Sequence, residues 1–184
     1  MLIPTTVLTN PSGGGSFSLI ETQALGADAG NVTFSAIPGT YEHLMILWTA
    51  RGTDAGNPDV YLRFNGDTGA NYDRELLSAV GASAAAAPSV AQTAIQTIGT
   101  MPGSAATAGR AAGGAIRIPS YARTTFWKTA VGDFSDIRAT GGGNELAGMT
   151  GGIWRSTAAI TSVTLLPSAG NFLAGSVFSL YGIA

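Results

Sequence analysis

The sequence predicts an all-β protein in which short antiparallel strands form a sandwich or a barrel. Three observations predict this fold class. Apolar and polar residues alternate along much of the chain, and clusters of Gly, Pro, Asn and Asp separate the alternating segments. The chain of 184 residues is also long enough for one domain with a buried core.

The elements follow one another from an N-terminal arm into a single domain. Residues 1–15 contain Pro4, Pro11 and three consecutive glycines, and we interpret them as an N-terminal arm, either a free tail or an extended segment that docks on a neighbouring subunit. Residues 16–184 are expected to form the domain, with about ten strands that include 17–19, 32–34, 41–49, 60–64, 116–118, 126–131, 146–153, 163–165 and 172–180. The segment 41–49 is almost continuously apolar, which predicts a central strand buried on both faces.

One region departs from the alternation. Residues 79–112 are rich in Ala, Gly and Ser, and we interpret them as a long connection that carries one small element. Pro88 and Pro102 bound the segment 90–98, whose apolar spacing favours a short helix and whose threonines favour a strand. A loop of this length is expected to contact another molecule. The glycines at 141–143 are interpreted as a hinge.

The composition describes a neutral protein with few charges. Charged residues make up 11% of the chain, against roughly 25% in soluble domains, so the surface suits close packing against other subunits. The net charge of −2 and the absence of a basic cluster argue against nucleic acid. The absence of cysteine excludes disulfides and thiolate metal sites. The longest strongly apolar run, 44–48, is too short to span a bilayer, so no membrane insertion is expected.

The most informative stretch is the run FNGDTGANYD at 64–73, which suits a hairpin turn, a metal loop or a sugar-contacting loop. Four side chains offer oxygen atoms to a cation: Asn65, Asp67, Asn71 and Asp73. A calcium loop would need another ligand where Gly69 stands. Asn65-Gly66 is the strongest short hairpin signal, so we favour a hairpin turn with Asp67 and Asn71 capping backbone groups in the loop.

The sequence contains little that would support catalysis. His43 is the only histidine, no G-x-S-x-G elbow accompanies it, and we interpret it as a strand histidine with its hydrogen bonds satisfied. Asp73 and Glu75 share one face of a strand at a separation that glycosidases use, but catalytic pairs come from facing elements. Trp48 is expected in the core. No catalytic, cofactor-binding or metal-ligating residues and no cofactors are therefore expected.

Several motifs resemble one family of viral proteins. They are Ile-Pro-Gly-Thr-Tyr at 37–41, Leu-Arg-Phe-Asn-Gly-Asp-Thr-Gly-Ala-Asn-Tyr at 62–72, Ile-Pro-Ser-Tyr at 118–121 and Ala-Gly-Ser-Val-Phe-Ser-Leu-Tyr-Gly-Ile at 174–183. In this order they resemble small structural proteins of tailed bacteriophages, and the resemblance covers residues 30–184. It implies an antiparallel, jelly-roll-like β-sandwich that decorates capsids or forms tail and fibre parts, usually without enzymatic activity and often as a trimer.

The first functional hypothesis is a capsid decoration, or cement, protein located in the virion. Its expected partners are further copies of itself, as a homotrimer, and virion proteins such as the major capsid protein. The alternative is a tail or fibre protein that binds host glycans through its loops, with Asp67 and Tyr72 among the contacts. A third hypothesis, a glycosidase or depolymerase, rests only on Asp73 and Glu75.

Overall fold

The computed structural model describes residues 16–137 and 145–184, and their alternating segments form twelve β-strands. The strands are β1 (Phe17–Ala24), β2 (Val32–Phe34), β3 (His43–Ala50), β4 (Asp59–Phe64), β5 (Tyr72–Val80), β6 (Ser83–Gln92), β7 (Ile95–Thr100), β8 (Ala112–Pro119), β9 (Lys128–Ile137), β10 (Glu145–Trp154), β11 (Val163–Pro167) and β12 (Val177–Ile183). The expected N-terminal arm at 1–15 and the glycine hinge at 141–143 lie outside the described residues.

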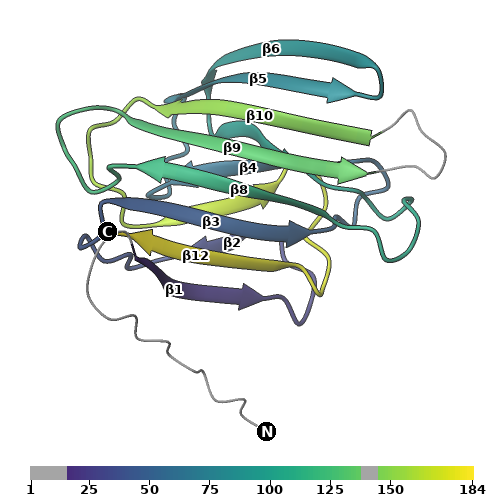
Figure 1. Ribbon diagram of the computed structural model, residues 1–184, viewed down its shortest axis with the longest axis horizontal. Helices are drawn as coiled ribbons and strands as arrows, with labels where there is room; N and C mark the ends of the chain where they lie inside the picture. Colours follow the sequence, from purple (N-terminus) through teal and green to yellow (C-terminus); the bar gives the residue numbers. More distant parts are fainter. Residues whose placement is uncertain (1–15, 138–144) are drawn as a thin grey trace, which may run out of the picture.

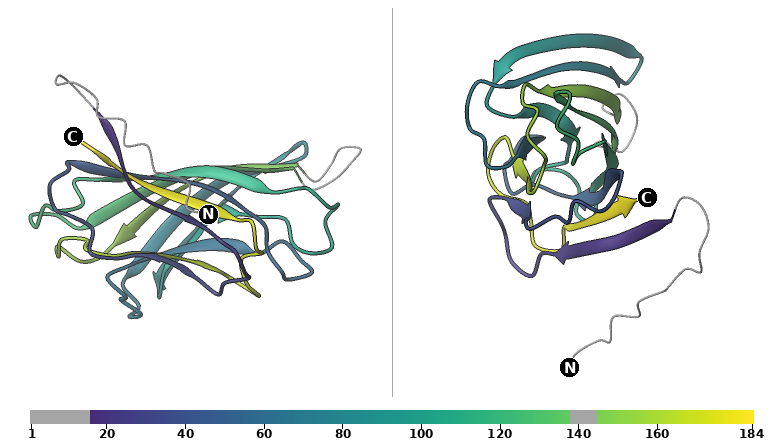
Figure 2. Two further views of the ribbon diagram at one scale, coloured as in Figure 1. Left: turned by 90° about the horizontal axis from the view of Figure 1, so that it is seen from below. Right: turned by 90° about the vertical axis from the view of Figure 1, so that its left-hand side faces the viewer.

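The strands form two antiparallel sheets that pack on each other, which confirms the predicted β-sandwich. The larger sheet has eight strands in the order β1-β12-β3-β8-β9-β10-β5-β6, and the smaller has four in the order β2-β11-β4-β7. Figure 1 looks onto the larger sheet, with β2 and β4 of the smaller sheet behind it. The two layers are seen from the side in Figure 2. One face of the larger sheet therefore points to the smaller sheet, and the other is its outer face.

The core lies between the sheets and is made mainly by every second residue of the central strands. On β3 the inner residues Leu44, Ile46 and Trp48 are buried, and Leu62 and Phe64 of β4 meet this layer from the smaller sheet. Because side chains alternate across a strand, a slip of one residue would carry the whole apolar set to the other face. The register is therefore fixed by burial.

Bulky inner side chains sit directly against glycines of the larger sheet. A Cβ atom added to Gly152 would lie 2.4 Å from Cγ2 of Ile95, and one added to Gly132 would lie 2.5 Å from the Ile98 carbonyl oxygen. Both neighbours belong to β7, so these glycines let β7 approach the backbones of β9 and β10. Sheet spacing here depends on the absence of side chains.

The structure differs from the expected long connection at 79–112. This region holds the end of β5, all of β6 and β7 and the start of β8, and its longest stretch without a strand is the segment 101–111 between β7 and β8. Strand β6 pairs with β5 after a two-residue turn, while β7 joins the smaller sheet. The segment 90–98 is therefore neither a helix nor a single strand, because the chain crosses between the sheets at 93–94.

The structure also corrects the expectation that segment 41–49 is buried on both faces. Its inner residues are buried, but on the outer face of the larger sheet Leu47 is 44% exposed. No element of the described chain covers that face of β3, because the smaller sheet packs only on the opposite side. Strand β3 thus has the apolar composition of a strand that is buried on both faces, but its outer face is exposed in the single chain.

Close packing at the inner glycines gives a test of the fold. We expect Gly152→Ala to lower the free energy of unfolding by about 1–3 kcal/mol, because the added methyl group overlaps Ile95. Urea denaturation followed by circular dichroism measures the change. Ala147→Ser, at an exposed position of the same strand, is the control and should stay within about 0.5 kcal/mol of the wild type. Equal stability of the Gly152 variant and the wild type would contradict this packing.

Candidate functional site

The stretch 64–73 forms a tight turn, but the turn is not a hairpin. Asn65 and Gly66 both have positive φ angles, 50° and 66°, and the Asp67 amide donates to the Phe64 carbonyl oxygen at 2.9 Å. The turn type therefore matches the Asn-Gly signal. The hairpin prediction is wrong because β4 belongs to the smaller sheet and β5 to the larger one, so the turn carries the chain between sheets.

Asp67 is the centre of the loop that follows this turn. Its carboxylate accepts hydrogen bonds from the Gly69 amide at 2.8 Å, the Asn71 side-chain amide at 2.9 Å and the Trp154 indole N–H at 2.7 Å. These bonds, led by that of Trp154, hold the pKa of Asp67 below its usual value. The predicted cap on a backbone group is confirmed for Asp67, whereas the Asn71 side chain bonds to Asp67 itself.

The other polar groups of the loop also bond within the protein. The Asn65 side chain accepts from the amides of Thr161 and Ser162 at 2.8 and 3.1 Å and donates to the Ala159 carbonyl at 2.8 Å. Tyr72 is fully buried, its hydroxyl bonds to the backbone of Phe64, and burial raises its pKa to about 12. The loop is thus a structural joint, and Tyr72 does not reach the surface where a glycan would bind.

The structure places Asp73 and Glu75 on the outer face of β5, as their spacing predicted. Asp73 accepts from the Ala91 amide at 2.7 Å and lies 3.7 Å from the Arg155 guanidinium. Glu75 is exposed on the same strand, and Gly151 of β10 is its partner in register. The two carboxylates therefore do not face each other across a cleft.

His43 has the structural role that was expected of it. It is the first residue of β3 and is half-buried, and its Nδ1 accepts a hydrogen bond from the Ser120 amide at 3.1 Å. Within residues 16–137 and 145–184, no three His, Cys, Asp or Glu side chains gather closely enough to hold a metal ion. The same part of the chain contains no helix long and apolar enough to cross a membrane.

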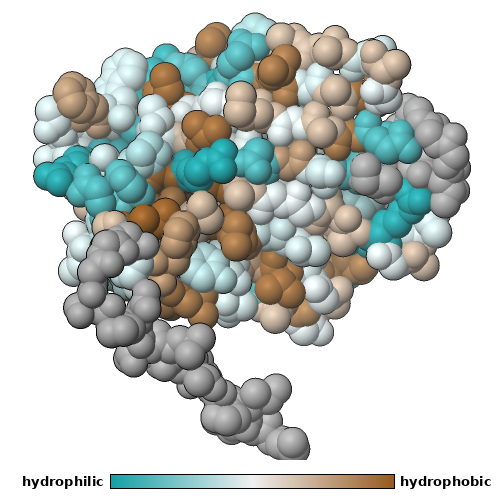
Figure 3. All heavy atoms as spheres, in the orientation of Figure 1, coloured by the Kyte–Doolittle hydropathy of each residue, from teal (hydrophilic) through white to brown (hydrophobic). Residues whose placement is uncertain are grey.

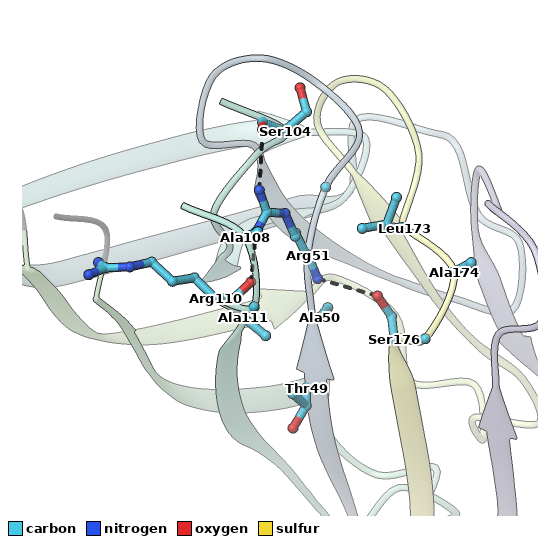
Figure 4. A pocket seen from close by; sticks show the side chains of 13 residues that line it. Thr49, Ala50, Arg51, Ser104, Ala108, Arg110, Ala111, Leu173, Ala174 and Ser176 are labelled. Carbon is cyan, nitrogen blue, oxygen red and sulfur yellow. Dashed lines mark hydrogen bonds between the residues drawn. The ribbon is translucent and has the colours of Figure 1, made fainter. Parts of the chain in front are cut away.

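A hollow of about 450 Å³ lies between the β7–β8 connection and the loop before β12. Arg51 lines it, but its guanidinium donates to the backbone carbonyls of Ser104 and Arg110, both at 3.2 Å (Figure 4). It also donates to the carbonyls of Ala106 at 2.6 Å and Thr107 at 2.8 Å. Arg51 therefore fixes the connection rather than offering its charge to a ligand. This hollow is a consequence of loop packing.

The outer face of the larger sheet is the most extensive feature open to a partner. Seven exposed apolar side chains project from it: Phe17, Leu19, Leu47, Leu77, Met149, Ile153 and Val177. Figure 3 views this face, where hydrophobic residues are spread among weakly polar ones. Arg117 and Asp133, on neighbouring strands of this face, form an ion pair at 2.6 Å. The face therefore presents apolar area with little net charge.

At one end of this face, Lys128 holds a loop that displays two aromatic side chains. The Lys128 ammonium is buried and donates to the carbonyls of Arg123 at 2.5 Å and of Phe126 and Thr157 at 3.1 Å. Burial lowers its pKa. In contrast, Phe126 is 80% and Trp127 is 55% exposed. The structure therefore removes Phe126 and Trp127 from the strand expected at 126–131 and places both outside the core, unlike Trp48.

Comparison with known proteins leaves the chain without an assigned relative. The sequence matches no protein-family model and no curated protein. The sequence motifs and the outer face of the larger sheet are therefore the observations that bear on function.

The Asp67 network predicts a pH-dependent stability. Asp67→Asn should lower the free energy of unfolding at neutral pH by about 1 kcal/mol, because the Trp154 indole N–H loses a charged acceptor. Since the folded pKa of Asp67 is lowered, its contribution is fully present above about pH 4 and is lost as the pH falls through the folded value.

Urea denaturation at neutral pH and at about pH 2.5 measures this difference. The gap between wild type and Asp67→Asn should narrow in acid. Asp54→Asn, which changes an exposed turn carboxylate that accepts from the Gly56 amide, is the matched control. A gap of equal size at both pH values would refute the role assigned to Asp67.

Proposed function

We propose that this protein is a non-enzymatic structural protein of a tailed-bacteriophage virion, and that it decorates the capsid as an oligomer. The motifs at 37–41, 62–72, 118–121 and 174–183 support the virion part of this proposal. The assembly part is supported by a single observation, the open outer face of the eight-stranded sheet. Asp67, Asn65 and Arg51 bond to backbone groups of the connections, and the open outer face favours packing against another protein.

The size of the outer face suits a stable contact. Eight strands spaced about 4.8 Å apart and four rows of side chains about 6.6 Å apart give a face of roughly 800 Å². That is about the area that one partner contributes to a standard protein interface. Seven exposed apolar side chains are distributed over this area, among polar ones and the Arg117–Asp133 ion pair. The face therefore supports a role in assembly.

The central strands β3 and β12 of this face support a role in assembly most strongly. Met45 and Leu47 of β3 point outward beside Tyr181 and Ser179 of β12, with which they are in register. An apolar strand in the middle of a sheet is typical of burial on both sides. In the isolated chain only the inner side is covered, so we assign the outer side to a neighbouring virion protein.

The glycan-binding alternative has less support. It drew on Asp67 and Tyr72, and both side chains bond within the protein at the joint between β4 and β5. The glycosidase hypothesis drew on Asp73 and Glu75, which lie side by side on one strand without a facing acid. Capsid decoration is therefore the function that we carry forward.

The proposal predicts that a charge on the outer face weakens attachment to the particle. With purified virions from which the protein has been removed, Leu47→Arg should reduce rebinding about tenfold or more, because the new guanidinium must be desolvated in the contact. Co-sedimentation with the particles measures the bound fraction. Thr68→Arg, which adds the same charge to the exposed tip of the 64–73 loop, should rebind like the wild type.

Image reconstruction of complete particles provides the second measurement. Copies of the protein on the capsid shell are expected. Particles without any copy on the shell, or equal rebinding of the Leu47→Arg and wild-type proteins, would refute the decoration function.

A further inference from the structure

One glycine of the larger sheet has no explanation within the single chain. The described strands contain eight glycines: Gly99, Gly113, Gly114, Gly132, Gly148, Gly151, Gly152 and Gly182. At seven of them an added Cβ atom would meet another atom at 3.3 Å or less, but at Gly151 it would meet nothing within 4 Å. Its φ is not positive either. Glycine weakens a strand, and at an open position it often marks the close approach of a second molecule.

Gly151 forms the floor of a shallow apolar hollow on the outer face. In register it lies between Val131 of β9 and Glu75 of β5. The hollow has a volume of about 400 Å³, and Thr129 and Ile153 also line it. Asp73, Arg74 and Glu75 line the β5 side, and Asp73 is paired with Arg155, so this rim carries charges of both signs. The missing side chain at Gly151 thus creates a socket rather than relieving a clash.

The aromatic loop next to this socket forms a matching projection. Thr129 is exposed on the outer face of β9, and Trp127, which precedes the first residue of β9, is 55% exposed and lines a small hollow together with Thr129 and Pro119. Because the Lys128 ammonium bonds to three carbonyls of this region, the loop is fixed before any partner binds. A fixed aromatic side chain loses little conformational entropy on binding and is a common anchor of protein interfaces.

The projection and the socket lie side by side on one face. Trp127 precedes Val131 by four residues, or about 13 Å along an extended strand, and Thr129 separates them. When a projection and its socket share one face, a second copy turned by 180° can place its own projection in the first copy's socket, and both contacts form at once. The same surface then serves both copies.

We infer that two copies of this chain pair through this face, each inserting Trp127 into the Gly151 hollow of the other. The two-fold axis lies in the plane of the contact, near Thr129. The contact is mainly apolar, because charged groups next to it are already paired within the chain, Arg123 with Glu42 at 2.8 Å and Asp73 with Arg155 at 3.7 Å. Leu47 and its neighbours on β3 and β12 lie on the other half of the sheet and stay available to a different protein.

This pairing differs from the trimer that the family resemblance implies. A three-fold ring needs a projection and a socket on different sides of each subunit, because each copy must bind one neighbour with its projection and the other neighbour with its socket. Here they share one side. The inference does not depend on a place in the virion, and purified protein alone tests it.

The test measures the mass of the purified full-length chain by sedimentation over a dilution series. The wild type should have twice the mass of one chain and should dissociate on dilution. Trp127→Ala, which removes the projection, and Gly151→Leu, which fills the socket, should each raise the dissociation constant about tenfold or more. The double variant should be no weaker than the weaker single one, since both changes break the same contact.

Ala147→Leu is the matched control, because it adds a bulkier side chain to the same strand and face but outside the hollow, and it should pair like the wild type. Trp48 and Trp154 are buried, so a blue shift of tryptophan emission on pairing reports Trp127. If Gly151→Leu disturbs folding, Trp127→Ala still tests the contact, because Trp127 is exposed and its removal leaves the core intact. A monomer at all concentrations, a trimer, or a dimer that both variants leave unchanged would overturn the inference.

Discussion

Close approach of the two sheets at side-chain-free positions is the constraint on which the rest of the structure depends. Ring atoms of Trp48 would lie 2.4 Å from a Cβ atom at Gly99 of the facing sheet. Within the larger sheet, Trp48 would lie 2.9 Å from a Cβ atom at its cross-strand neighbour Gly114, and Phe134 would lie 2.5 Å from one at Gly148. Large inner side chains therefore occupy space that glycines leave open. This matching fixes the register of the strands, and the register decides which side chains form the outer face.

The outer face follows a different chemistry from the inner one. It combines apolar side chains with small and weakly polar ones, and the Arg117–Asp133 pair largely neutralises its centre. Polar side chains elsewhere are used to hold the connections, as Asp67 does between β4 and β5 and Arg51 does before β8. The broad outer face is the surface that the proposed assembly would use.

The sequence predicted the all-β class and most strands, because alternation is a local property. It did not predict β6 and β7, since Ala, Ser, Thr and Gln give little contrast between the two faces. The Asn65-Gly66 turn signal is also local, so it could not show that β4 belongs to the smaller sheet and β5 to the larger one. The adjacent Gly151 and Gly152 look alike in sequence, and only the fold separates the packed glycine from the exposed one.

The central claim is that the outer face of the larger sheet is covered when the protein assembles. Hydroxyl-radical labelling compares the dilute chain with the assembled protein at single residues, and methionine is a sensitive reporter. Met149 on the outer face is 49% exposed, while Met101 is buried in the core. The account predicts strong labelling of Met149 in the dilute chain, protection of Met149 on assembly, and weak labelling of Met101 in both states. Equal labelling of Met149 in both states would contradict it.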